Sequence, residues 1–254
     1  MAGHSKWANI KRKKEKTDAQ KAKSFTRVTR EIIVATKAGG GDPDANFQLR
    51  LAIQNAKKVN MPNENIARAI KRGLGSTDDD QFEEIIYEGY GSGGVAFLVQ
   101  TLSDNRNRTA SEMRYIFSRN NGNLGESGCV SWLFEQKGVI TVAKENINMN
   151  EEELFEFILE IGADDVHLEE DYYEIITEVS ELETVRNLVA EKTSIEEAGL
   201  SFIPKNTVEV NGETAVSLLK LVDALEEHDD VQNVYANFEV SDEELEKLNT
   251  SLSS

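Results

Sequence analysis

Hydrophobic residues near the N-terminus recur every three or four positions, which is the spacing of an amphipathic helix. Within Ser24–Ala38 the apolar positions are Phe25, Val28, Ile32 and Ala35, and most of the basic residues fall on the other side. The three glycines that follow, Gly39–Gly41, should end this helix, because a residue without a Cβ adopts left-handed conformations at little cost.

Two further helices are predicted before residue 76. Asp42-Pro43 should begin the second, because Asp is a favoured N-cap and Pro a favoured first helical residue, and this helix should run to about Val59. Met61-Pro62 should begin the third, which ends at Gly73 and Gly75. Together the three segments predict a small helical bundle.

After residue 80 the pattern changes to an alternation of strands and helices. Ile85–Tyr90 and Val95–Leu102 are predicted strands, joined by a glycine-rich hairpin turn at Gly91–Gly94. Helical spacing returns in Arg106–Asn120, and Val130–Phe134 is predicted to be another strand. This order indicates an α/β domain that begins with a hairpin.

The segment from Val139 to Ile203 has the order strand, helix, strand, strand, helix, strand, which is that of a ferredoxin-like domain. A helix at Thr214–Leu225 and a strand at Val231–Val240 follow it. These two elements could complete the sheet that Ile85 begins. The ferredoxin-like unit would then be an insertion within a split second domain.

The predicted fold class is therefore α+β with three domains: an N-terminal helical bundle followed by two ferredoxin-like α/β domains, the third inserted in the second. The expected divisions are a basic helical domain at residues 1–78, a split α/β domain at 79–135 plus 207–240, an acidic ferredoxin-like domain at 136–206, and a tail at 241–254.

Charge is distributed unevenly between these domains. The whole chain has 28 Lys and Arg against 46 Asp and Glu, a formal net charge of −18. Residues 1–75 nevertheless carry 17 basic against 6 acidic residues, whereas residues 76–254 carry 11 against 40. A basic module joined to an acidic one is typical of proteins that bind nucleic acid or another anionic surface through one end.

The composition disfavours several classes of protein. No apolar run approaches the ~18 residues of a transmembrane helix and no secretion signal is apparent, so we expect a cytoplasmic protein without a membrane partner. The single cysteine, Cys129, excludes an internal disulfide and falls on a predicted core strand, and the three histidines are far apart. We therefore expect no catalytic or metal-binding residues, no cofactor and no small-molecule substrate.

The strongest candidate site is a dense basic run in the N-terminal arm. Lys and Arg neutralise phosphates and release counterions without reading sequence, and Trp7 could stack on an unpaired base. The alternative is a solvated charged surface on which Trp7 anchors the arm to the bundle. The predicted nucleic-acid-binding residues of the arm and the helical domain are Lys6, Trp7, Lys11, Arg12, Lys13, Lys14, Lys16, Lys21, Lys23, Arg27, Arg30, Arg68, Lys71 and Arg72.

A secondary candidate lies at Asp104–Thr109, where a strand passes into a helix. A helix N-terminus with nearby arginines is suited to phosphate, which makes Arg106 and Arg108 candidate phosphate ligands. The alternative has equal weight: Asp104 or Asn105 caps the helix, and the arginines pair with nearby acids.

Eight short motifs follow one another along the first 140 residues: Met1–Lys11 (MAGHSKWANIK), Gly39–Asn46 (GGGDPDAN), Asn60–Pro62 (NMP), Ala69–Gly73 (AIKRG), Tyr87–Gly91 (YEGYG), Asp104–Thr109 (DNRNRT), Gly122–Gly125 (GNLG) and Lys137–Ile140 (KGVI). Together they closely resemble the motifs of the YebC/PmpR family. The remainder of the chain fits the family in length. Arg12 stands where many members have His, and Phe47 where Pro is common. Neither departure disturbs the resemblance.

The resemblance implies a three-domain cytoplasmic protein, with a helical N-terminal domain followed by two α/β domains. Bacterial members of the family are described as probable transcriptional regulators that bind DNA. Relatives act in translation at the ribosome, some by easing elongation through proline-rich stretches. We therefore predict a DNA-binding regulator, with a ribosome-associated RNA-binding translation factor as the alternative. No helix-turn-helix recognition helix is apparent in the sequence, so strong base readout is not expected.

Overall fold

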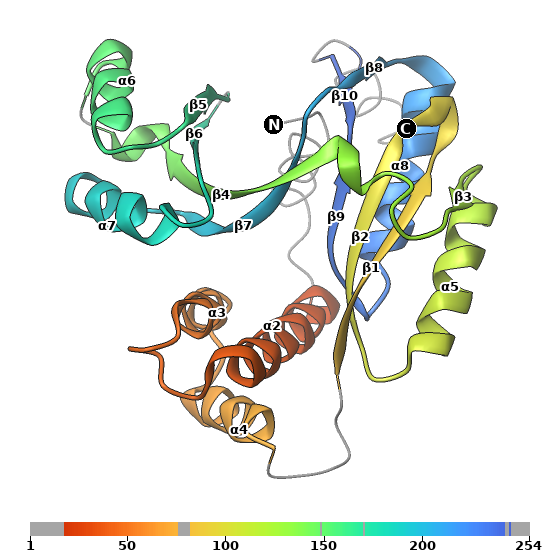
Figure 1. Cartoon of the computed structure of the whole chain (residues 1–254), viewed down its shortest axis with the longest axis horizontal. Coiled ribbons are helices and arrows are strands. Elements are labelled where there is room, and N and C mark those ends of the chain that lie inside the picture. The colour runs from red at the N-terminus through yellow and green to blue at the C-terminus, as the bar shows by residue number, and fades with distance from the viewer. Residues whose placement is uncertain (1–17, 76–81, 148, 170, 242–243, 245–254) are drawn as a thin grey trace. The chain divides into compact units, whose positions relative to one another are not determined.

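The computed structural model describes residues 18–75, 82–147, 149–169, 171–241 and 244 (Figure 1). The chain divides into two compact units, one of residues 134–203 and the other of the chain on both sides of that segment. Within the described residues, helices alternate with largely antiparallel sheets, which confirms the α+β class.

Three helices form the described part of the N-terminal region: α2 (Asp18–Gly39), α3 (Phe47–Lys58) and α4 (Asn63–Gly73). Their apolar faces meet in one core, in which Ile32, Ile33 and Leu49 are fully buried. The apolar stripe predicted for the first helix is buried there, apart from the half-buried Phe25. Burial of each large side chain stabilises the bundle by about 1.5–3 kcal/mol.

The second helix starts four residues after the predicted Asp42-Pro43, and the intervening residues form a turn. Its N-cap is the buried Asn46, whose Oδ1 accepts the N–H of Leu49 at 3.1 Å. The Nδ2 group of Asn46 donates to the carbonyl oxygens of Ala35 and Gly40, at 2.7 and 2.8 Å. One side chain therefore begins α3 and also satisfies carbonyl groups at the end of α2. Sequence rules for helix starts consider only neighbouring residues, so they do not detect the second role.

The unit that flanks residues 134–203 contains a four-stranded sheet. Its order is β3-β1-β2-β9, where the strands are β1 (Glu83–Tyr90), β2 (Ala96–Ser103), β3 (Asn123–Leu124) and β9 (Val231–Ala236). β1 and β2 form an antiparallel hairpin across the predicted glycine-rich turn. β9 pairs antiparallel with β2, so a strand from beyond residue 203 completes the sheet, as the element order predicts.

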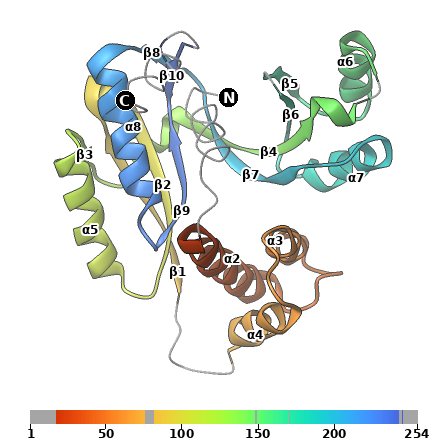
Figure 2. The same cartoon turned by 180° about the vertical axis from the view of Figure 1, so that it is seen from behind.

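Helices α5 (Arg106–Arg119) and α8 (Gly212–Glu226) share one hydrophobic core with this sheet, and Figure 2 shows α8 lying over one of its faces. The ring of Phe97 meets Phe117 of α5 edge to face, with 6.0 Å between the centroids, and lies 6.3 Å from the ring of Phe238. All three rings are fully buried. The core therefore needs residues from both sides of the inserted unit.

The predicted strand at Val231–Val240 is interrupted at Asn237, which separates β9 from β10 (Phe238–Val240). Asn237 Oδ1 accepts the N–H of Ala96 at 2.7 Å, and the Asn237 N–H donates to the Ala96 carbonyl at 3.2 Å. The chain then leaves this sheet, and β10 pairs in parallel with β8 (Val208–Val210) in a separate two-stranded sheet.

Residues 134–203 form the second unit. Its elements are β4 (Phe134–Ala143), α6 (Glu151–Glu160), β5 (Asp165–Leu168), β6 (Tyr172–Thr177), α7 (Leu182–Lys192) and β7 (Glu197–Pro204). The sheet order β5-β6-β4-β7 is that of a ferredoxin-like domain, because the first and third strands of the segment are neighbours at its centre. In the flanking sheet the first two strands are neighbours instead, so its order differs.

The strand predicted at Val130–Phe134 begins only at Phe134. Ser131–Leu133 form a 3-10 turn, η2, because backbone N–H groups of this segment bind a buried carboxylate and are not available to a sheet. Cys129 consequently lies half-buried in a loop and not on a core strand, which corrects its predicted position. Burial raises the pKa of its thiol, and the charge of Glu88 adds to the effect.

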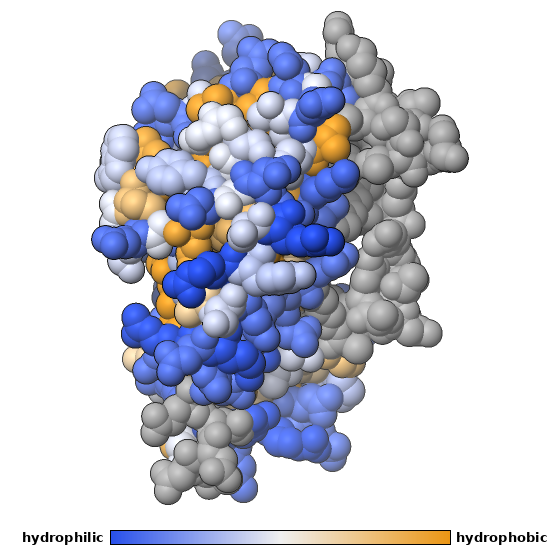
Figure 3. Space-filling model, turned by 90° about the vertical axis from the view of Figure 1, so that its right-hand side faces the viewer, coloured by the Kyte–Doolittle hydropathy of each residue, from blue (hydrophilic) through white to orange (hydrophobic). Residues whose placement is uncertain are grey.

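Figure 3 shows one face of the molecule, on which hydrophobic residues form patches bordered by hydrophilic ones. Within the described ranges, no helix has both the length and the apolar character needed to cross a bilayer.

Candidate nucleic-acid interface

Several predicted basic residues lie on the surface of the three N-terminal helices. Arg27, Arg68 and Lys71 are exposed, and Arg72 is half-buried. Lys21 and Lys23 belong to α2. The predicted residues of the arm that lie outside the described ranges are Lys6, Trp7, Lys11, Arg12, Lys13, Lys14 and Lys16.

Three more exposed cations lie on these helices and were missing from the prediction. Lys37 lies in the last turn of α2, and Lys57 and Lys58 lie in the last turn of α3. Cations are favoured at helix C-termini, where they offset the negative end of the helix dipole. The predicted end of the second helix near Val59 was the signal that could have identified the last two.

Arg30, also predicted to contact nucleic acid, faces inward. One of its guanidinium nitrogens lies 3.0 Å from Oδ1 of Asp230 and donates to the carbonyl oxygen of Asp229. The guanidinium also lies 5.4 Å from the centre of the Phe82 ring, and the side chain is 14% exposed. Arg30 therefore connects α2 to the segment before β9.

Asp230 is the centre of this ion-pair network. Its side chain is 2% exposed, and its Oδ2 accepts hydrogen bonds from Arg108 at 2.8 Å and from the Thr109 hydroxyl at 2.7 Å. Burial alone would raise the pKa of Asp230, but the hydrogen bonds from Thr109 and Arg108 and the charge of Arg30 outweigh it and hold the pKa below its ordinary value.

The N-terminus of α5 is occupied by the protein's own groups. Asn105 Oδ1 accepts the N–H of Arg108 at 3.1 Å and caps the helix. The Arg108 guanidinium lies 3.0 Å from Asp104 and 2.8 Å from Asp230. At this turn, therefore, Asn105 caps the helix and Arg108 is paired with acidic side chains. Arg106, the other predicted phosphate ligand, is exposed.

His228 and Glu112 extend the same network. His228 Nδ1 accepts the N–H of Asp230 at 3.1 Å, so its Nε2 carries the hydrogen directed at Glu112, 2.8 Å away. These three residues bring possible ligand atoms within 4.8 Å of one another. Both oxygens of Asp230 already contact guanidinium groups, so arginine charges take the place that a metal ion would need.

A second buried carboxylate, that of Glu88, orders the loop before η2. Its oxygens accept the backbone N–H groups of Gly128, Val130 and Ser131 at 2.6, 2.8 and 2.8 Å. Burial alone would raise the pKa of Glu88. The hydrogen bonds from these backbone N–H groups outweigh that effect and hold the pKa below its ordinary value. In the sequence, Glu88 lies within the predicted strand Ile85–Tyr90. A charged residue at such a position was the signal that its carboxylate binds a partner within the fold.

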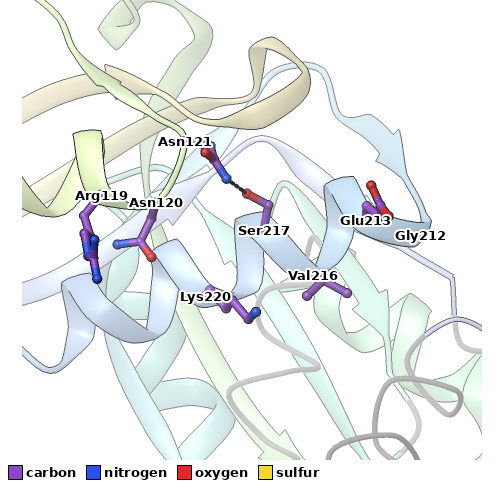
Figure 4. Close-up of a pocket in the computed structure, with 8 residues that line it drawn as sticks. All are labelled: Arg119, Asn120, Asn121, Gly212, Glu213, Val216, Ser217 and Lys220. Carbon is purple, nitrogen blue, oxygen red and sulfur yellow. Dashed lines mark hydrogen bonds between the residues drawn. The ribbon is translucent and has the colours of Figure 1, made fainter.

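A pocket of about 590 Å³ lies where the end of α5 meets the N-terminal half of α8 (Figure 4). Arg119 comes from α5, and Ser217 and Lys220 come from one side of α8. Asn121 Nδ2 donates to Ser217 Oγ at 3.3 Å, and Glu213 lies at the margin. The pocket therefore presents two cations and several neutral polar groups.

Two family models match the chain. The model described as the TACO1/YebC protein N-terminal domain matches residues 5–76, and the model described as the TACO1/YebC second and third domain matches residues 82–238. The chain belongs to the TACO1/YebC family. The family predicted from the short motifs is thereby confirmed.

Relatives in the TACO1/YebC family align over nearly the whole chain. A "Probable transcriptional regulatory protein" of Persephonella marina is 56% identical over 251 residues, which are 98% of this chain and 100% of the relative. A protein of the same name from Pelotomaculum thermopropionicum is 55% identical over 243 residues, 95% of this chain and 100% of the relative. The crystal structure of a conserved hypothetical protein from Aquifex aeolicus is similar with a TM-score of 0.83 and 51% identity, covering 89% of this chain and 93% of that one.

Proposed function

We propose that the protein is a DNA-binding regulator of transcription that acts in the cytoplasm through its basic N-terminal helical domain. In this proposal the helical domain is residues 1–78, and the α/β domains are residues 79–135 plus 207–240 and residues 136–206. The acidic α/β domains face partners, and the protein has no catalytic chemistry of its own.

The separation of charge is the observation that carries the proposal. Residues 1–75 carry 17 basic against 6 acidic residues, and residues 76–254 carry 11 against 40. Exposed cations at the ends and on the surfaces of α2–α4 continue the basic composition of the preceding arm. A phosphate backbone attracts such a surface and repels the acidic remainder, so the protein binds in one orientation. The names of the relatives support regulation as the outcome of binding.

Fluorescence anisotropy with a labelled 30-base-pair promoter fragment tests the proposal. The double variant K13Q/K14Q removes two arm charges, and K192Q/K205Q, which neutralises two exposed lysines of the acidic part, is the matched control. If the arm contacts two phosphates, the slope of log K against log salt decreases in magnitude by about 1.8. The control keeps the wild-type slope, and equal behaviour of both variants would contradict the proposed use of the arm.

A competition experiment tests the regulatory part of the proposal. A promoter site should bind more tightly than an unrelated duplex at physiological salt, because a regulator must discriminate. Equal affinity for all duplexes would contradict the role in transcription. Crosslinking in cells, followed by sequencing of bound DNA and RNA, then decides between the genome and ribosomal RNA as the physiological target.

A further inference from the structure

Basic residues are concentrated on one helix of the otherwise acidic α/β part. Residues 82–133 and 204–240 contain six Lys and Arg, and four of these are on α5. A fifth, Lys220, lines the pocket at the end of α5 together with Arg119. The same residue ranges contain 14 Asp and Glu. Five of the six cations of this part of the chain are therefore on α5 or in the pocket at its C-terminal end.

The arginines of α5 differ in what they contact. Arg108 is paired with Asp230 and Asp104, as described above, and is committed to the fold. Arg114 and Arg119 are exposed, and in the described part of the chain neither lies within salt-bridge distance of a carboxylate. Lys220 is likewise exposed. The charges of these three side chains are available to an anion from solution.

The geometry of α5 arranges these charges around a neutral stripe. At 3.6 residues per turn, Arg114 and Arg119 are about 140° apart around the helix and about 7.5 Å apart along it. Ser111, Tyr115 and Ser118 lie between them on the exposed side, and Tyr115 is 67% exposed. A negatively charged strand that lies along this stripe meets one cation on each side.

Nearby acids do not cancel this charge. Glu112, the one acid within α5, contacts Arg108 and His228. Glu213 lies at the pocket margin, and Glu244 accepts the N–H of Gly212 at the start of α8 at 2.7 Å. Since Glu244 occupies that helix terminus, the available positive charge belongs to the side chains of Arg114, Arg119 and Lys220.

We propose that the exposed side of α5, with the pocket at its C-terminal end, is a second contact surface for the phosphodiester backbone of a nucleic acid. The proposal rests on the proposed function, because it assigns a further surface to the same ligand. It moves the candidate phosphate contacts of this helix from its capped N-terminus to Arg114, Arg119 and Lys220. At about 21 Å for its 14 residues, α5 spans roughly six phosphates of one strand.

The test uses the full chain and three variants with equal changes of charge: R114Q/R119Q on α5, K13Q/K14Q in the arm, and K192Q/K205Q as the control. Each is titrated with labelled duplex DNA and with duplex RNA of the same sequence over a range of salt. The R114Q/R119Q variant should bind roughly tenfold or more weakly to at least one of them at low salt. For DNA, the slope of log K against log salt should decrease in magnitude by about 1.8. The polymer that shows the loss identifies whether DNA or RNA is the source of the phosphates.

The outcomes separate this proposal from the proposed function. Loss of affinity in K13Q/K14Q with wild-type binding by R114Q/R119Q would overturn the α5 surface and leave the arm as the binding site. Absence of nucleic-acid binding by the wild-type protein would overturn both. Equal loss in the control would show a general effect of net charge and would also overturn the α5 surface. Unchanged thermal unfolding confirms that these exposed substitutions leave the fold intact.

Discussion

Replacing Asp230 with Asn should loosen the connection between α2 and the sheet. The substitution keeps the shape but removes the charge that Arg30 and Arg108 contact at 3.0 and 2.8 Å. Charge-assisted hydrogen bonds contribute about 1.5–3 kcal/mol each, and loss of one partner of a buried pair costs about 3–5 kcal/mol. Arg108 is 43% exposed and can regain water, which reduces its share. We expect a loss of about 2–3 kcal/mol.

Thermal unfolding followed by circular dichroism measures this loss. For a unit of this size it corresponds to a decrease of roughly 5–10 °C in the melting temperature. The matched control is Asp229→Asn, because the neighbouring carboxylate is exposed and only its backbone oxygen contacts Arg30. A double-mutant cycle with Arg108→Gln should give a coupling free energy of about 1 kcal/mol or more.

The pH dependence gives an independent check. The folded-state pKa of Asp230 is lowered, so its stabilisation is fully present above the unfolded-state pKa, about 3.9. It is lost as the pH falls through the folded-state value. The wild-type protein and Asp230→Asn should therefore differ at neutral pH and converge in acid below pH ~4. Equal melting temperatures at pH 7, or a gap that persists in acid, would refute the assigned role of this carboxylate.

Three further substitutions test local contacts. Glu88→Gln should weaken the hydrogen bonds from Gly128, Val130 and Ser131 and lower the free energy of unfolding by about 1–3 kcal/mol. Amide hydrogen exchange at Val130 should become faster, and unchanged exchange would contradict the anchoring role of Glu88. Asn46→Ala should destabilise the helical bundle by about 2 kcal/mol, whereas Asp42→Ala in the exposed turn should have a small effect in the same urea titration. Gly138→Ala should destabilise the 134–203 unit by about 1–3 kcal/mol, because a Cβ would meet Thr177 Oγ1 and lie 2.9 Å from Leu182 Cβ. Gly199→Ala, with nothing within 4 Å, is its control, and equal melting of the two would count against close packing at Gly138.

Most helices and strands follow from local patterns, because periodicity and glycine placement act over a few residues. The end of α2 at Gly39 and the hairpin turn before β2 are examples. The predicted start of α3 was wrong by four residues. Asn46 caps this helix because its side chain also binds carbonyl groups at the end of α2. The break at Asn237 depends in the same way on a partner in β2, Ala96. Tertiary contacts therefore determine where these two elements begin and end.

The candidate site shows the same division. Clustering of basic residues is visible in the sequence, but which of them are committed to the fold is not. Arg108 and Asp230 are 122 residues apart in the chain, so their pairing has no local signal. Arg30 shares a helix with the exposed Arg27, yet its side chain is only 14% exposed. Which basic side chains remain accessible to a ligand can therefore be told only from the folded structure.

The insertion of residues 134–203 sets the order of events while the chain is being synthesised. β2 ends at Ser103 and its partner β9 begins at Val231, so the sheet lacks an edge strand until the whole insertion has emerged from the ribosome. At about 5–20 residues per second, that delay is roughly 7–25 s. During it, the unpaired edge of β2 and the apolar face of α5 await β9 and α8. A nascent chain of which residues up to about 205 have emerged from the ribosome would thus combine an unfinished sheet with a complete ferredoxin-like unit, and its exposed apolar surface is of the kind that chaperones bind.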